Sequence, residues 1–94
     1  MAKLQFYFEN GPLSGQSFSI SDGMTIGRSD SNLLTVSDQT VSGKHAKIVV
    51  KGEAFSIVDL DSTNGTMVNG QKVSEMSIKS GDQIQFGKVV TRVK

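Results

Sequence analysis

The stretch LQFYFENGP (residues 4–12) alternates apolar and polar residues and then ends in a turn signal. Leu4, Phe6 and Phe8 recur at every second position, which places them on one face of an extended strand. Asn10-Gly11-Pro12 then supplies residues that tolerate positive φ or preset a turn. This stretch therefore predicts a half-buried β-strand followed by a reversal of the chain.

The same two-residue period recurs outward from this stretch along the chain. Turn signals separate the apolar runs at intervals of mostly about 8–12 residues, a spacing typical of all-β domains. Many short strands with apolar faces to cover predict an all-β sandwich of two antiparallel sheets. The further alternating pairs are Phe18 and Ile20, Ile48 and Val50, and Ile84 and Phe86, and the further turn signals lie at residues 21–23, 51–53, 64–65, 69–70 and 80–82.

Two segments show less pattern than the rest. Residues 29–40 are expected to be mainly a surface loop, in which Leu34 and Val36 could form a short strand. Residues 71–80 place Val73 and Met76 three apart, but they lack a convincing helix cap and end at a glycine. We therefore expect loop and short strand there, and no helix.

The size and charge of the chain restrict its function. Ninety-four residues suffice for one hydrophobic core, so residues 1–94 are expected to form a single domain. Ten Lys and Arg against nine Asp and Glu give a net charge of +1, far below the basic excess of proteins that neutralise many nucleic-acid phosphates. We expect no nucleic-acid partner, and any anion that binds should be held locally.

The composition also bears on location and cofactors. The chain contains no Cys, which excludes a disulfide framework and a thiolate metal site. No apolar run approaches the roughly 20 residues that cross a bilayer. We therefore expect a cytoplasmic protein with no membrane partner, no metal site and no cofactor.

Three polar segments lie between the predicted strands. Loops at one end of a β-sandwich can gather in space although they are far apart in sequence. Together these segments would offer one guanidinium, several hydroxyls, an amide and Gly-flanked backbone N–H groups, all of which can donate hydrogen bonds to anionic oxygens. The segments are Gly27-Arg28-Ser29, residues 41–46 (VSGKHA) and residues 59–70 (DLDSTNGTMVNG).

The order of these segments resembles the forkhead-associated (FHA) domain. Gly-Arg is followed by Ser-x-x-His and then by Asp-x-x-Ser-Thr-Asn-Gly-x-x-x-Asn-Gly. The resemblance runs from about Leu4 to Val93, and each motif gains specificity from the other two. It implies a β-sandwich of about 10–11 strands, with binding loops at one end and a phosphothreonine peptide as ligand.

The resemblance also implies roles for individual residues. Arg28 would pair with the phosphate and Ser42 would hydrogen-bond it. Thr63 would lie beside the phosphothreonine, and Asn64 would hold the peptide backbone. The planar fork of an Arg suits a group of about −1.5 to −2 charges with three acceptor oxygens better than a Lys does.

Other residues would support or complete the site. His45 would tie the binding loop down, while Gly65 and Asn69 would shape the turn that follows; Gly27 would also be structural. Gly43 stands in the binding segment where the family often has Arg or Asn, so a side-chain contact to the peptide is missing. Lys44 is the candidate substitute for that contact.

The function implied by the resemblance is a non-catalytic, phosphothreonine-dependent interaction module in Ser/Thr kinase signalling. Its partner would be a phosphothreonine-containing protein or peptide, either a kinase substrate or the kinase itself, and a monomer is favoured. Two alternatives stay open. Gly43 favours a scaffold that recruits partners through a sheet face without phosphate, and Ser42 with His45 and an Asp would suit a hydrolase, although no Gly-x-Ser-x-Gly elbow is present.

Overall fold

The computed structural model describes residues 3–94, which form eleven short strands and, within that range, no helix. The count agrees with the ten to eleven strands expected. Accordingly, the described residues contain no helix that could span a membrane. The strands are β1 (Gln5–Phe8), β2 (Ser17–Ser19), β3 (Thr25–Gly27), β4 (Leu34–Thr35), β5 (Ala46–Lys51), β6 (Ala54–Asp59), β7 (Thr66–Val68), β8 (Gln71–Val73), β9 (Glu75–Ile78), β10 (Gln83–Phe86) and β11 (Val89–Val93).

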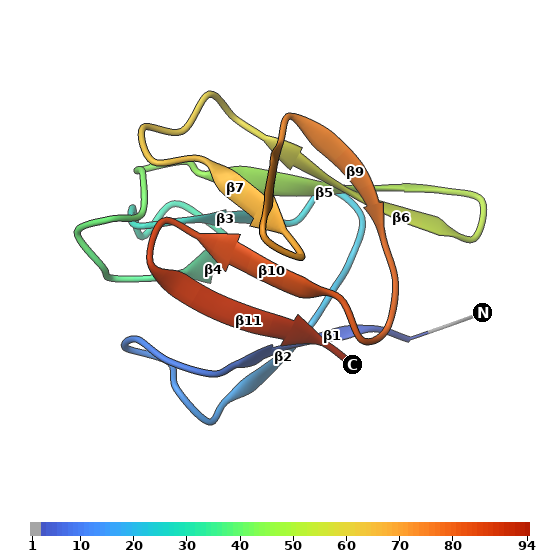
Figure 1. Cartoon of the computed structure of the whole chain (residues 1–94), viewed down its shortest axis with the longest axis horizontal. Coiled ribbons are helices and arrows are strands. Elements are labelled where there is room, and N and C mark those ends of the chain that lie inside the picture. The colour runs from blue at the N-terminus through green and yellow to red at the C-terminus, as the bar shows by residue number, and fades with distance from the viewer. Residues whose placement is uncertain (1–2) are drawn as a thin grey trace.

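The strands form two sheets, as predicted (Figure 1). One sheet has the order β2-β1-β11-β10-β7-β8, and the other has the order β4-β3-β5-β6-β9. The expectation of antiparallel pairing is wrong for one pair, because β3 and β4 run parallel, with Ile26 opposite Leu34. The Leu33 N–H donates to the Thr25 Oγ1 at 3.3 Å, so the chain has returned to the start of β3 when β4 begins.

The core lies between the sheets and contains most of the residues that the alternation placed there, while Phe18 and Val50 are partly buried and pack against it. Phe6 and Phe8 are fully buried, and each such side chain contributes about 1.5–3 kcal/mol relative to an exposed one. The Phe6 ring meets the Phe86 ring edge to face at 5.8 Å between centroids. The predicted apolar side chains of β1 and β10 therefore lie on the same inner face of the six-stranded sheet and contact each other across β11.

The two weakly patterned segments both form short strands. Leu34 begins β4, which confirms a short strand there, but β4 ends at Thr35, so Val36 lies outside it. Both Leu34 and Val36 are buried in the core. Residues 71–80 form β8 and β9, separated by Ser74, and these strands belong to different sheets. The absence of a helix in this segment is confirmed.

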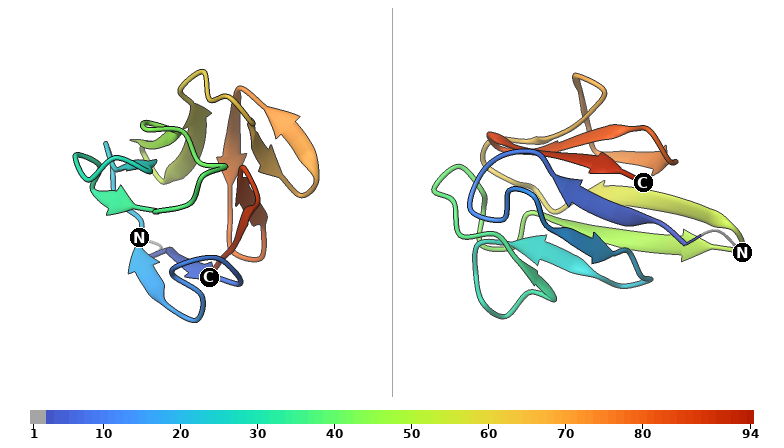
Figure 2. Two further views of the ribbon diagram at one scale, coloured as in Figure 1. Left: turned by 90° about the vertical axis from the view of Figure 1, so that its left-hand side faces the viewer. Right: turned by 90° about the horizontal axis from the view of Figure 1, so that it is seen from below.

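The pairing of β5 with neighbouring strands places all three polar segments at one end. Ala46, the first residue of β5, lies opposite Asp59, the last residue of β6, and it also lies opposite Ile26 near the end of β3. The chain before β5, after β6 and after β3 therefore emerges on the same side. In Figure 1 these loops lie at the left-hand end, and Figure 2 (left) looks onto that end.

Candidate functional site

Arg28 directly follows β3, and its backbone is tied to the loop that carries Ser42. The Arg28 N–H donates to the Ser42 carbonyl at 2.9 Å, and the Ser29 N–H donates to the Gly43 carbonyl at 3.2 Å. The Arg28 side chain is exposed, and neither of the two ion pairs found within residues 3–94 involves it. Arg28 therefore has an exposed side chain on a backbone that is bonded to Ser42.

Ser42 and Thr63 join the second and third loops. The Thr63 N–H donates to the Ser42 Oγ at 2.9 Å, although the two residues are 21 positions apart. A hydroxyl oxygen that accepts one hydrogen bond still has its own proton to donate. The Ser42 hydroxyl can thus be held by Thr63 and remain a donor toward an anion.

His45 lies beneath these loops and is completely buried. The Ser42 N–H donates to its Nδ1 at 3.1 Å, and its Nε2 lies 2.8 Å from the Gly65 carbonyl. Because a carbonyl only accepts, Nε2 carries the proton and the ring is neutral. Burial lowers the pKa of His45 below its ordinary 6.5, and this effect exceeds the opposing effects of the Gly65 carbonyl and the Asp59 charge.

Asp59, the last residue of β6, organises the loop between β6 and β7. Its carboxylate accepts from the Ser62 N–H at 3.1 Å, the Ser62 Oγ at 2.5 Å and the Thr66 Oγ at 2.7 Å. Burial by itself raises the pKa of Asp59, but the bonds from Ser62 and Thr66 outweigh it and lower the pKa overall. The carboxylate is therefore ionised at neutral pH, and its hydrogen bonds hold the loop between β6 and β7.

Asn64 is exposed and reaches across to the second loop. Its Nδ2 donates to the Thr40 carbonyl at 2.8 Å, and the Thr40 Oγ accepts from the Lys88 N–H at 2.8 Å. The side-chain nitrogen of Asn64 is thus engaged by the domain itself, whereas the Oδ1 oxygen is a remaining acceptor for a peptide N–H.

Gly27 and Gly43 stand next to each other where the first two loops meet. A Cβ on Gly27 would overlap the Gly43 carbonyl oxygen and lie 2.7 Å from the Asn32 side chain, whereas a Cβ on Gly43 would meet no atom within 4 Å. Gly27 therefore permits the close approach of the loops, and Gly43 leaves open space beside Ser42. Lys44, the next residue, is exposed.

The two remaining predicted residues lie at opposite ends of β7. Gly65 is buried, and its carbonyl accepts from His45, so it belongs to the cluster. Asn69 instead bonds Asp82 through Nδ2 at 3.0 Å and the Gln83 N–H through Oδ1 at 2.9 Å. The structure gives Asn69 a turn role, with a φ of 52°, and does not bring it to the cluster.

The geometry does not match a hydrolase. The His45 nitrogens face the Ser42 backbone N–H and the Gly65 carbonyl, and the Ser42 Oγ accepts from Thr63. A catalytic serine needs its hydroxyl within reach of the imidazole nitrogen that takes the proton. In this cluster the imidazole binds backbone groups and supports the loops.

A groove of about 450 Å³ lies at the other end of β5, away from the predicted residues. Val50 and Phe55 from the β5–β6 hairpin line it together with Leu4 and Ile20. None of the residues predicted for phosphate binding contributes to it. Recognition of a phosphate by exposed side chains does not need such a cavity, so we assign the site from the loop contacts.

Sequence reasoning missed residues that hold the cluster together. Asp59 and Ser62 have a signal that could have revealed them, since an Asp followed three residues later by Ser is typical of local side-chain bonds to the backbone. The bonds of Thr40 to Asn64 and of Asn32 to Gly43 have no such signal, because the partners are 24 and 11 positions apart.

Comparison with known sequences shows which protein family has this order of motifs. The family model of the FHA domain matches residues 24–87. The glycogen accumulation regulator GarA of Mycobacterium tuberculosis is 35% identical over 81 residues, which cover 85% of this chain and 50% of GarA. The chain thus spans about half the length of the first curated relatives that it matches, each covered to 50%.

Solved structures agree in fold over the whole length. An FHA domain studied for phosphothreonine-dependent interactions has a TM-score of 0.90 and 30% identity, covering 99% of this chain and 96% of that chain. The FHA domain of FhaA, in complex with the intracellular domain of Rv3910, has a TM-score of 0.87 and 30% identity, covering 97% and 99%.

Proposed function

Since this chain belongs to the forkhead-associated domain family, we propose that it binds a phosphothreonine-containing segment of a partner protein through the loops after β3, before β5 and after β6. The partner is a substrate of a Ser/Thr kinase or the kinase itself. The domain performs no catalysis in this role, and it acts in the cytoplasm together with that kinase.

One observation carries the proposal: Arg28, Ser42 and Thr63 converge although they come from three separate loops. The hydrogen bonds from the Arg28 N–H to the Ser42 carbonyl and from the Thr63 N–H to the Ser42 Oγ, both 2.9 Å long, link the loops pairwise. Ser42 is therefore the residue at which the three loops meet, since it is bonded to the backbone of both Arg28 and Thr63.

The chemistry of this point fits a doubly charged phosphate. Arg28 supplies a permanent charge with paired N–H donors, and Ser42 supplies a hydroxyl donor. The exposed Asn64 would accept a peptide N–H through Oδ1, and the exposed Lys44 would add charge at the rim. A carboxylate offers one charge and two oxygens in a plane, so Asp and Glu should be poor substitutes for the phosphothreonine.

Calorimetric titration tests the proposal. A peptide library with a fixed central phosphothreonine and randomised flanks selects a binding sequence, and this peptide is then compared with its unphosphorylated form. We expect a dissociation constant in the roughly micromolar range for the phosphorylated peptide and no measurable binding of the other. Equal affinity for both peptides would refute phosphate recognition.

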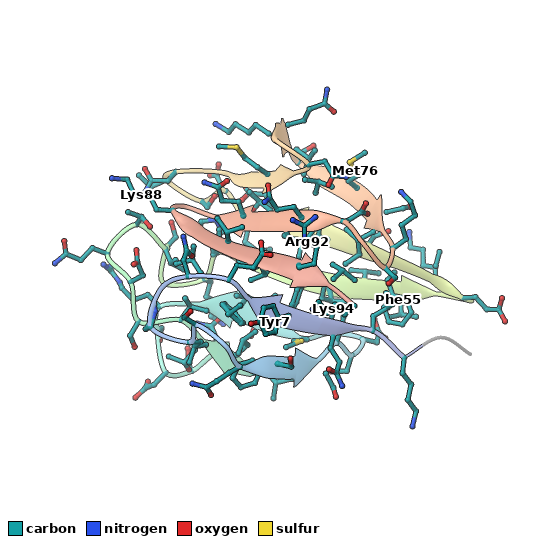
Figure 3. The ribbon with its side chains drawn as sticks, turned by 60° about the horizontal axis from the view of Figure 1, so that its bottom comes forward. Tyr7, Phe55, Met76, Lys88, Arg92 and Lys94 are labelled. Carbon is teal, nitrogen blue, oxygen red and sulfur yellow. The ribbon has the colours of Figure 1, made fainter. Side chains whose placement is uncertain are left out.

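Substitution of the two arginines of the chain locates the site. Arg28→Ala removes a charged hydrogen-bond donor from the phosphate, at a cost of about 1.5–3 kcal/mol or roughly ten- to a hundredfold in affinity. Arg92→Ala is the control, because Arg92 lies on the outer face of the six-stranded sheet, near Tyr7 and Lys94 (Figure 3). Equal binding by both variants would place the phosphate elsewhere.

A phosphate-independent scaffold is the second candidate, and Gly43 is the feature that favours it. A Cβ at this position would meet open space, so the domain offers no side chain where the family often has Arg or Asn. On this alternative, substitutions on a sheet face would abolish partner binding and Arg28→Ala would leave it unchanged. The same pair of arginine variants therefore separates the two functions.

A further inference from the structure

Asn32 is the polar side chain that joins the Arg28 loop to the Ser42 loop. Its Nδ2 donates to the Ser29 carbonyl at 2.7 Å and to the Gly43 carbonyl at 2.6 Å. Ser29 directly follows Arg28, and Gly43 directly follows Ser42. One carboxamide nitrogen thus bonds the neighbours of both residues proposed to hold the phosphate.

The burial of Asn32 leaves it no direct contact with a ligand. The residue is only 6% exposed, and a Cβ on Gly27 would come within 2.7 Å of its Nδ2. Asn32 therefore fills the junction between the loops from below. Asn32 can therefore affect ligand binding only through the positions of the Ser29 and Gly43 carbonyls to which it is bonded.

The orientation of the amide is set by its surroundings. Both carbonyls only accept hydrogen bonds, so the nitrogen has to face them. The Oδ1 atom is consequently buried with no hydrogen-bond partner among residues 3–94. A buried acceptor without a partner costs free energy. The two hydrogen bonds that Nδ2 donates offset this cost.

Backbone contacts alone would hold the two loops less firmly. The Arg28 and Ser29 N–H groups donate to the Ser42 and Gly43 carbonyls at 2.9 and 3.2 Å, respectively. The Gly43 carbonyl therefore accepts from both Ser29 and Asn32. Loss of Asn32 would leave the longer of these backbone bonds to hold the Gly43 side of the junction.

We propose that Asn32 is a positioning residue for phosphothreonine recognition, setting the distance between Arg28 and Ser42 by binding the Ser29 and Gly43 carbonyls. The inference rests on the proposed function, because the ligand is the phosphothreonine peptide proposed there. The geometry of the two loops can be tested without any ligand. It also accounts for a buried polar residue in a segment that was expected to be mainly a surface loop.

The test uses Asn32→Ala with Asn69→Ala as its control. Each variant removes an asparagine that makes two hydrogen bonds, but Asn69 makes them at the other end of β7. Both variants should lose stability. Only Asn32→Ala should weaken binding of the selected phosphothreonine peptide, by about five- to tenfold, as expected for one to two lost hydrogen bonds in the site.

A ligand-free readout separates this inference from the proposed function. Amide hydrogen exchange of Arg28 and Ser29 should become faster in Asn32→Ala and stay at the wild-type rate in Asn69→Ala. If the wild-type domain does not bind the peptide, the proposed function fails and the exchange rates alone decide on Asn32. Unchanged exchange at both amides, or equal peptide affinity of the two variants and the wild type, would overturn the positioning role.

Discussion

Gly27 is the residue at which two loops of the site come closest. The Gly43 backbone occupies the space that a side chain on Gly27 would need, with the Gly43 carbonyl carbon 2.9 Å from the ideal Cβ position. No rotamer relieves a contact with backbone atoms. The pairing of Arg28 with the Ser42 loop thus depends on the absence of a side chain one position earlier.

Two glycine substitutions test this contact. Gly27→Ala should destabilise the domain by at least about 1–3 kcal/mol, because the loops must move apart. Gly43→Ala should change the free energy of unfolding by less than about 0.5 kcal/mol, since its Cβ would meet open space. Urea unfolding of both variants is the measurement, and similar losses of stability would contradict the close approach at Gly27.

At the scale of elements, the end of β6 and the start of β7 are joined through Asp59. The Thr66 hydroxyl, at the first position of β7, donates to the Asp59 carboxylate at the last position of β6. These strands belong to different sheets. The carboxylate therefore closes the loop that carries Thr63 and Asn64 and holds it between the two layers.

Thr66→Val tests the closure with little change in shape. Loss of one hydrogen bond should cost about 0.5–1.5 kcal/mol and raise the pKa of Asp59 toward its ordinary 3.8. A lowered carboxyl pKa adds stability above that value, which is lost as pH falls through the folded-state pKa. The variant should therefore gain less stability than wild type between acid and neutral pH.

Thr91→Val is the matched control for this experiment. Thr91 is also fully buried, but its hydroxyl donates to the Ile84 carbonyl within the six-stranded sheet. Loss of this hydrogen bond should lower the free energy of unfolding equally at all pH values. Acid unfolding curves that shift alike for both variants would argue against the role of Asp59.

At the scale of the whole molecule, His45 connects the two sheets at the binding end. It precedes β5 of the five-stranded sheet, and its Nε2 donates to Gly65, which precedes β7 of the six-stranded sheet. Its ring also packs edge to face on Phe86 at 5.7 Å between centroids. The neutral ring thus supports the loops and the packing of the layers together.

Protonation of His45 should destabilise the domain at mildly acidic pH. Its folded-state pKa is lowered by burial, so the unfolded chain binds the proton more readily, and the stabilisation is complete above about pH 6.5. As pH falls from there through the folded-state pKa, stability should decrease by at most about 1.4 kcal/mol per pH unit. Urea unfolding between pH 7.5 and 5 measures this slope.

The control for this prediction is His45→Gln, which removes the only histidine of the chain. The variant should be less stable at pH 7.5, and its stability should vary little down to pH 5. The carboxylates with lowered pKa, Asp38, Asp59 and Asp82, stay ionised over that interval. A wild-type stability that is flat from pH 7.5 to 5 would exclude His45 as the responsible group.

The amino-acid sequence by itself determined the strands with clear alternation, the turns and the segments that form the site. The two-residue period of Leu4, Phe6 and Phe8 is a local pattern, and it produced the buried face of the first strand because successive side chains of a strand point to opposite sides. The glycine in each of the six predicted turns has a positive φ. These positions need a left-handed backbone conformation, which glycine adopts freely and other residues adopt at a cost.

Only the tertiary structure decided which residues meet across the loops. Four features have no local signature in the sequence. They are the parallel pairing of β4 with β3, the bond from Asn32 to Gly43, the bond from Asn64 to Thr40, and the position of Asn69 away from the cluster. Their partners become neighbours only when the two sheets pack and close the intervening chain. Local periodicity reports which side of a strand is buried, whereas the contacts between loops depend on how the whole chain is arranged.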